Sequence, residues 1–347
     1  MKTYSMNDAP LKIFGIPFYE RTGRLERVPE ELREKLERLK ILGRRVPGAR
    51  IGFRTDSKTL KVRMVLETLS VSREMSLFSG QSINVMAGNR RNARFLGLVV
   101  PADYESKTAE QEFRLSGEMQ DIMLYLPRNE IVETVEISVD DDAVIEAPTP
   151  YRNGTVVYYG SSITAGGCCT RITNAYTTLL SDWLDFDFYN LGFSGSARGE
   201  LEMADYINTF DMDVFVYDYD HNAPDAEHLR TTHEPFFKRF REKHPTTPVI
   251  ITSRPDIVGG TVFDARREAV RQTYLNAVAS GDENVWFIDG ETFFGKEDRE
   301  LCTLDRCHPN DLGMYRMAKV YEPVLREILE KIGKRREDSQ YGKCRNG

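Results

Sequence analysis

The chain has 347 residues, more than the roughly 250 to 300 at which one hydrophobic core usually stops growing, so two domains are expected. Its 47 Lys and Arg against 54 Asp and Glu give a formal charge of -7, and it has no basic block that would follow a phosphate backbone, which argues against a nucleic-acid partner. Residues 1–20 lack the apolar core of a secretory signal, and no later run approaches the ~20 apolar residues of a membrane span, so we expect a soluble cytoplasmic protein without a membrane partner.

The first half of the chain alternates apolar and polar residues with a period of two. Apolar residues from Leu60 to Met64 alternate with Lys and Arg, and the stretch from Val135 to Val139 repeats the pattern. This alternation is typical of half-buried antiparallel strands. The charged segment from Pro29 to Leu42 is the one helix expected among them. We therefore predict an all-β sandwich over residues 1–150.

The second half reads differently and begins after Ala147-Pro148-Thr149-Pro150, which disfavours both helix and ladder pairing. Short apolar runs here alternate with longer segments of helical period. The runs are Val156–Tyr159, Phe186–Asn190, Val214–Tyr217, Val249–Thr252 and Val285–Ile288. Repeated strand-then-helix units predict an α/β domain over residues 151–333, with a parallel sheet covered by helices on both faces. Residues 334–347 are polar and aperiodic, which predicts a disordered tail.

The residues that follow these runs matter most, because sites in open α/β sheets form where the carboxyl ends of strands meet the next loops. The first run ends in Gly160-Ser161-Ser162-Ile163-Thr164-Ala165-Gly166. The second ends in Asn190-Leu191-Gly192-Phe193-Ser194-Gly195, and the third in Asp218-Tyr219-Asp220-His221-Asn222. Just before the last helix stands Asp305-Arg306-Cys307-His308-Pro309-Asn310.

Together these four segments supply every group that acyl transfer requires: a nucleophile, a base, a group that orients the base, and donors for the developing oxyanion. Ser162 is the candidate nucleophile. Asp305 and His308, three residues apart on a short turn, can pair so that Nδ1 points to the carboxylate and Nε2 faces the cleft. The backbone amides of Ser162 and Gly195 and the side-chain amide of Asn222 form a candidate oxyanion hole.

Each segment alone has a plainer interpretation. A glycine-flanked serine after a strand is more often an ordinary turn or a phosphate-binding loop, and Gly195 is by default a turn glycine. Asn222 is more often a helix cap or Asx-turn residue than an oxyanion donor, and His308 before a proline would merely precede the helix. The joint occurrence of the four segments is what favours catalysis.

Two further residues are candidate substrate contacts. His221 also follows a strand and is the rival candidate for the base, but no acid stands in an obvious orienting relation to it, so we expect it to line the cleft. Arg254 ends the fourth run and can contact substrate, although a surface ion pair is the more frequent use of such an arginine. The remaining histidines lie in a polar helical stretch and at its exit and are expected to be solvated: His228, His233 and His244.

The five cysteines are an odd number in a fairly large protein, which argues against a disulfide framework. A zinc site is the sharper alternative for Cys168, Cys169, Cys302 and Cys307. Adjacent Cys168 and Cys169 cannot supply C-x2-C spacing, so we predict no metal ion and reduced, partly buried thiols.

The four segments, in this order, resemble the four blocks of the SGNH hydrolase superfamily. The closer resemblance is to bacterial GDSL-type lipases and esterases with an all-β N-terminal domain marked by a GxDLY-like signature. That signature appears here as Gly117-Glu118-Met119-Gln120-Asp121-Ile122-Met123-Leu124-Tyr125-Leu126-Pro127, and Gly52-Phe53-Arg54-Thr55-Asp56-Ser57 looks like another recurring piece. The resemblance covers about residues 12–332.

The resemblance implies a flavodoxin-like α/β/α catalytic domain with Ser162 as nucleophile, His308 as base with its partner Asp305, and Gly195 and Asn222 completing the oxyanion hole. It implies no metal and no organic cofactor. Two departures stand out. The second position of the GDSL block is Ser161 and not Asp, which leaves open how the strand end is tied down. The third block reads Asp-His-Asn in place of Gly-x-Asn-Asp, so the assignment of Asn222 to the oxyanion hole rests on its position after the third run.

The expected function is a serine esterase that removes short acyl groups, above all acetyl groups from small carbohydrates, with an acetylated oligosaccharide as partner. Carbohydrate esterases that join a jelly-roll domain to an SGNH domain share this order, which is analogy at the level of fold. If the protein is an enzyme of another specificity, the alternative is a lysophospholipase or an acyl-thioester hydrolase. A sugar-binding protein with a vestigial triad is the alternative of another class. Whether the protein forms a homo-oligomer stays open.

Overall fold

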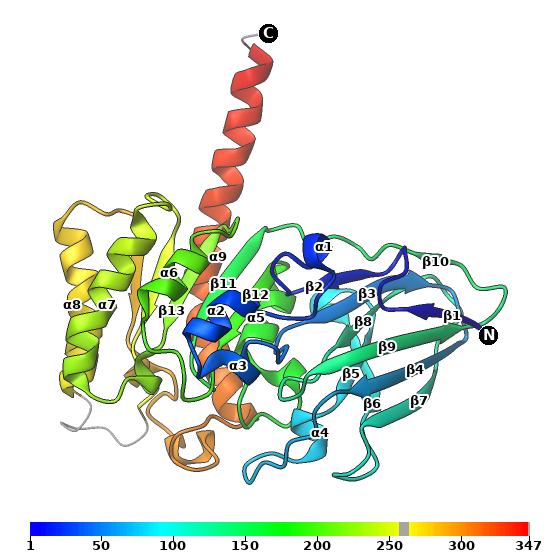
Figure 1. Cartoon of the computed structure of the whole chain (residues 1–347). Coiled ribbons are helices and arrows are strands. Elements are labelled where there is room, and N and C mark those ends of the chain that lie inside the picture. The colour runs from blue at the N-terminus through cyan, green and yellow to red at the C-terminus, as the bar shows by residue number, and fades with distance from the viewer. Residues whose placement is uncertain (257–263, 346–347) are drawn as a thin grey trace.

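The computed structural model describes residues 1–256 and 264–345, with side chains described up to Lys334. A sandwich of antiparallel strands and an α/β lobe lie side by side, with β11 and α5 next to the sandwich (Figure 1). The fold class expected from the sequence is therefore confirmed. Among the helices of the described chain, none combines the length and apolarity that a membrane crossing requires.

The sandwich consists of two antiparallel sheets. One has the strand order β1 (Lys2–Ser5), β9 (Val132–Val139), β4 (Thr59–Leu66), β7 (Thr108–Arg114). The other has the order β10 (Ile145–Glu146), β3 (Arg50–Thr55), β8 (Gln120–Tyr125), β5 (Ile83–Ala87), β6 (Arg94–Val99), with β2 (Lys12–Phe14) beside β3. The alternation in β4 explains its place: Val62 and Met64 are buried between the sheets, whereas Lys61 and Arg63 form surface ion pairs with Glu110 and Glu136.

The prediction of a single helix from Pro29 to Leu42 is wrong. The segment forms two short helices, α2 (Glu30–Lys35) and α3 (Leu39–Leu42), because Leu36 leaves the helical region with ψ 76°. Leu32 and Leu39 are buried against the α/β lobe and not among the β-strands. Two further short helices, α1 (Tyr19–Thr22) and α4 (Leu77–Gly80), were not expected.

The α/β lobe holds a five-stranded parallel sheet in the order β12 (Asp187–Gly192), β11 (Thr155–Gly160), β13 (Val214–Asp218), β14 (Val249–Thr252), β15 (Val285–Ile288). One face packs against α5 (Tyr176–Leu184) and α9 (Asp311–Arg345), the other against α6 (Leu201–Ile207), α7 (Ala226–Arg241) and α8 (Asp264–Ala279). Short 3-10 turns lie at Arg90–Asn92, Ile172–Asn174, Asp220–Asn222, Gly290–Thr292 and Arg299–Cys302. The strand order is flavodoxin-like, and its switch point lies between β11 and β13.

Two segments differ from their expected state. Where the sequence indicates a disordered tail from residue 334, the backbone continues α9 as a helix to Arg345, and residues 346–347 lie outside the described part. Extending a packed helix needs no new nucleus, and the segment is rich in helix-forming Lys, Arg and Glu. His233 is the second case: it is 1% exposed, stacks on Tyr219 and hydrogen-bonds Thr273 through Nδ1. Burial lowers its pKa to about 3.

Strand β8 joins the two lobes, because both of its faces are buried from Ile122 to Tyr125. Ile122 and Leu124 belong to the core of the sandwich, whereas Met123 and Tyr125 pack into the core of the α/β lobe. The Tyr125 hydroxyl donates a 2.9 Å hydrogen bond to the carboxylate of Asp182 on α5. The GxDLY-like signature is thus the strand that fixes the lobes to each other.

The stability that the interface between the lobes contributes is expected to depend on pH. Burial raises the pKa of Asp182 from 3.8 to about 6, and the Tyr125 hydrogen bond and Arg50 oppose this shift only in part. The native carboxyl keeps a proton that the unfolded one has lost, so its contribution to stability falls as pH rises from about 4 to about 6. Asp182→Asn keeps an acceptor for Tyr125 and should melt higher than the wild type at pH 8, by a margin that shrinks at pH 4. A lower melting temperature of the variant at pH 8 would show that Arg50 stabilises the carboxylate more than burial costs.

Candidate active site

A serine, a histidine and an aspartate form a continuous hydrogen-bonded relay at the carboxyl edge of the parallel sheet. Ser162 Oγ lies 2.9 Å from His308 Nε2, and His308 Nδ1 lies 2.8 Å from Asp305 Oδ2. The other oxygen of Asp305 accepts from the backbone amides of His308 and Cys307. Partial burial would raise the pKa of Asp305, but these hydrogen bonds outweigh it and hold the pKa below its usual range. The carboxylate is therefore ionised and holds the ring with Nε2 toward the serine.

The turn after β11 is tied down from the neighbouring strand. The Ser161 amide donates to Thr164 Oγ1, and the Ser161 hydroxyl accepts from the amide of Ile163. Thr164 Oγ1 lies 3.3 Å from the buried carboxyl of Asp218, at the end of β13. A Cβ at Gly160 would come 2.0 Å from that threonine oxygen, so only glycine fits there. Thr164 and Asp218, which the sequence did not single out, thus anchor the strand end where the GDSL block has Ser161.

Three candidate oxyanion donors come from three loops. In the described chain, neither the Ser162 amide nor the Gly195 amide is used in a protein hydrogen bond, so both are available to a ligand. Gly195 has φ +65°, a conformation that favours glycine. The Asn222 side-chain nitrogen donates one hydrogen at 2.8 Å to the carbonyl of Phe193. That bond fixes the amide and leaves its second hydrogen for another acceptor.

An ion pair below the sheet edge positions the His221–Asn222 turn. Asp220 is fully buried, pairs with Arg266 of α8 at 3.1 Å, and accepts from the backbone amide of Arg254. Arg266 also donates to the carbonyls of Asp220 and Ala223. The loop that carries Asn222 is therefore held by α8, through a long-range contact that no local sequence pattern predicts.

His221 lies beside the relay but is not part of it. Its Nδ1 lies 3.8 Å from the thiol of Cys307, the neighbour of His308, and among the described residues no carboxylate pairs with its ring. Burial, followed by the positive charge of Arg254, lowers the pKa of His221 well below its usual range. The imidazole is neutral, and among the described residues it has a hydrogen bond to the backbone of Pro255 but no carboxylate that would orient it as Asp305 orients His308.

Arg254 lies at the carboxyl end of β14, next to the same turn. It is partly buried, and burial is the main cause that lowers its pKa, opposed by the charge of Asp220. The structure therefore places both candidate substrate contacts, His221 and Arg254, at the edge of the sheet that carries the relay.

The cysteines are free thiols, with Cys169 and Cys302 buried and Cys168 and Cys307 partly so; the Cys344 side chain lies outside the described part. Burial raises the pKa of Cys168 to about 12 and raises that of Cys307. Asp305, Cys307 and His308 offer ligand atoms within 4.8 Å of one another. Because both ring nitrogens of His308 already face Ser162 and Asp305, a metal ion there would compete with the relay.

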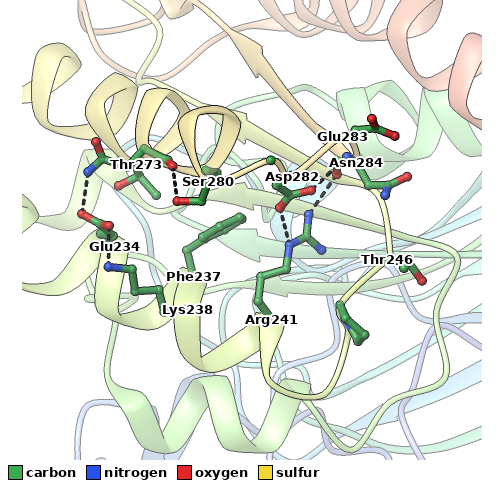
Figure 2. A pocket seen from close by; sticks show the side chains of 14 residues that line it. Glu234, Phe237, Lys238, Arg241, Thr246, Thr273, Ser280, Asp282, Glu283 and Asn284 are labelled. Carbon is green, nitrogen blue, oxygen red and sulfur yellow. Dashed lines mark hydrogen bonds and ion pairs between the residues drawn. The ribbon is translucent and has the colours of Figure 1, made fainter.

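A pocket of about 460 Å3 lies elsewhere, between α7 and α8 (Figure 2). Thr246 and Asn284, which line it, precede β14 and β15, so it opens at the amino edge of the sheet. Four of its charged side chains are paired within the protein: Arg241 bonds Asp282, and Lys238 bonds Glu234. It contains none of the predicted site residues.

Comparison with known families gives two matches. Residues 153–326 match the GDSL-like Lipase/Acylhydrolase family, and residues 1–145 match the GxDLY family, described as the N-terminus of Esterase_SGNH_hydro-type. No curated protein matches the chain.

Solved structures show the same two-lobed fold. A GDSL-like lipase structure from Bacteroides ovatus is 27% identical, covers 95% of this chain and 98% of its own, and superposes with a TM-score of 0.84. A salicylyl-acyltransferase from a tetracycline biosynthetic pathway is 20% identical over 96% of this chain and 97% of its own, with a TM-score of 0.76. A family two carbohydrate esterase from Clostridium thermocellum, in complex with cellohexaose, is 17% identical over 83% of this chain and 93% of its own, with a TM-score of 0.61. At these identities the last two show likeness of fold alone.

Proposed function

Because the chain belongs to the GDSL-like lipase/acylhydrolase family, we propose that it is a serine esterase that acts through an acyl-serine at Ser162. The observation that carries this proposal is the relay from Ser162 Oγ through His308 to Asp305, at 2.9 and 2.8 Å. These are hydrogen-bond distances suited to proton transfer from a nucleophile to its base.

The relay supports a double displacement. His308 Nε2 accepts the proton as Ser162 Oγ attacks the ester carbonyl, and the imidazolium that forms is stabilised by Asp305. The amides of Ser162, Gly195 and Asn222 are the proposed donors to the oxyanion. Proton return from His308 to the alcohol oxygen releases the alcohol, and water, deprotonated by the same histidine, then cleaves the acyl-serine.

Asn222→Ala should lower kcat by roughly 10²- to 10³-fold with little change in KM, because an oxyanion donor is needed chiefly as charge develops. The substitution also removes the hydrogen bond to Phe193, so kcat and the melting temperature must be measured together. A lower melting temperature with near-normal turnover would make Asn222 a purely structural residue.

We further propose a short acyl group, above all acetyl, carried by a small carbohydrate, with His221 and Arg254 toward the alcohol part. The segment that follows Ser162 supports a short acyl group, since it is built of small residues folded into tight turns: the Gly167 amide donates to the Ser162 carbonyl at 2.7 Å. The proposal of a carbohydrate substrate rests on likeness of fold to carbohydrate esterases.

One observation favours longer or more apolar esters, as in lysophospholipase or thioesterase activity. Leu301 and Leu304, on the loop that leads to Asp305, are 62% and 56% exposed. Exposed apolar side chains beside a catalytic loop can contact an acyl chain.

Acyl-length profiling separates these substrates. With p-nitrophenyl esters from acetate to octanoate, kcat/KM should fall steeply beyond acetate, because a small pocket cannot admit added methylenes without strain. Acetylated xylo- and manno-oligosaccharides, run beside them, should release acetate. Equal or better turnover of octanoyl esters, or fatty acid released from lysophospholipid, would overturn the acetyl-sugar proposal and leave the serine-esterase proposal standing.

A further inference from the structure

A buried arginine of the β-sandwich reaches the loop that follows Ser162. Arg128 stands three residues after β8 and is 2% exposed. Its Nη1 lies 3.0 Å from the sulfur of Cys169, and its Nη2 donates to the Cys169 carbonyl at 3.1 Å. Nη2 also contacts the Ser79 hydroxyl and, at 2.9 Å, the sulfur of Met75.

Within the described residues, no carboxylate lies at ion-pair distance from the Arg128 guanidinium. A buried cation without a partner costs free energy, and an apolar side chain of similar volume would avoid that cost. What the guanidinium supplies instead is a rigid fork of donors, two of whose contacts end on one residue of the catalytic loop.

The loop it holds leads directly to the nucleophile. The Gly167 amide donates to the Ser162 carbonyl, and the Cys169 sulfur lies 3.0 Å from the carbonyl of Gly166 and 2.9 Å from that of Arg171, so the loop after Ser162 is held by contacts within itself. Ser79, on α4 of the sandwich, donates to the Cys169 carbonyl at 2.7 Å. The Thr170 amide and hydroxyl bind Asp311, three residues after His308. Two adjacent residues at the far end of the loop are thus fixed, Cys169 to the sandwich and Thr170 to the start of α9.

We propose that Arg128 is a positioning residue through which the β-sandwich holds the Ser162 loop in its reactive geometry. This inference rests on the proposed serine-esterase function and goes beyond it, since it assigns the sandwich a part in the rate of acylation. A displacement of about 1 Å between a nucleophile and its base can cost on the order of 10²-fold in rate.

The experiment compares Arg128→Lys with Arg50→Lys. Arg50 is a matched control, because it is equally buried, also comes from the sandwich, and also reaches the α/β lobe, but it pairs with Asp187 at the opposite edge of the sheet from Ser162. For each variant, kcat and KM for p-nitrophenyl acetate, the melting temperature, and the rate at which a fluorophosphonate probe labels the serine are measured.

We expect Arg128→Lys to lower kcat and the labelling rate by about 10- to 100-fold while KM stays within about threefold. Arg50→Lys should lose melting temperature but keep kcat within about twofold. If Arg128→Lys does not fold, Ser79→Ala, which removes the hydroxyl shared by Arg128 and the Cys169 carbonyl, should lower kcat about three- to tenfold in the same assays.

Two outcomes overturn the inference: a folded Arg128→Lys, or Ser79→Ala in its place, with wild-type kcat and labelling, or equal losses of kcat in the Arg128 and Arg50 variants. Failure of the probe to label the wild-type protein at all would instead contradict the proposed serine-esterase function. The two failures are therefore distinguishable.

Discussion

Ser162→Ala is expected to abolish ester hydrolysis, with kcat lowered by roughly 10⁴- to 10⁶-fold. Among the described residues, its hydroxyl is the one side-chain oxygen in hydrogen-bond contact with His308 Nε2, at 2.9 Å. Because Ser162 is partly exposed on a turn and not in a core, the variant should fold and melt close to the wild type. The measurement is kcat for p-nitrophenyl acetate, together with the melting temperature and a mass spectrum of the acyl-enzyme.

Ser194→Ala is the matched control, since Ser194 is exposed on the loop after β12 and its hydroxyl makes no hydrogen bond within the described structure. It should keep wild-type turnover and still show the acyl adduct. More than a tenth of the wild-type activity in a folded Ser162→Ala protein would remove Ser162 from the mechanism.

Asp305→Asn is expected to lower kcat by up to about 10⁴-fold, although it changes only one carboxylate oxygen to an amide nitrogen. Asp305 Oδ2 accepts from His308 Nδ1, whereas an amide nitrogen there would donate and favour the tautomer with its proton on Nε2. That tautomer cannot accept the serine proton. The measurement is kcat, with the melting temperature to show that the turn still folds.

The companion pair His308→Ala and His221→Ala tests which imidazole is the base. His308→Ala should lose activity to the same degree as the Ser162 variant. His221→Ala should change mainly KM, because His221 lies beside the relay and no carboxylate of the described residues orients it. Loss of turnover in the His221 variant alone would reverse the assignment.

The strands and the relay could be predicted because their signals are local. Alternation places Val62 and Met64 in the sandwich, and Asp305 and His308 are three residues apart, so their pairing depends on one turn. Ser162 and His308 are 146 positions apart, so no local pattern predicts their contact. It could be predicted because the four segments occur in the order found in a known superfamily.

The contacts that hold the site were not predictable in the same way. Arg128 meets Cys169, and Asp220 meets Arg266, across 41 and 46 positions, and no local pattern specifies which buried polar groups will meet. His233 is different, because a signal existed. It shares one helical face with Leu229, Phe236 and Phe240, all buried, so its spacing of three, four and seven residues predicts burial where the polar composition suggested solvent.

From Ile122 to Tyr125, strand β8 has no face that meets water. Ile122 and Leu124 serve one core while Met123 and Tyr125 serve the other, so a cut near Pro148 would strip each half of apolar surface that only the other half covers. The sandwich is therefore less a removable module than a further layer of the hydrolase itself. If the protein evolved toward another substrate, a substitution in the core on one side of this strand would require a compensating substitution in the core on the other side. The two lobes would therefore change together.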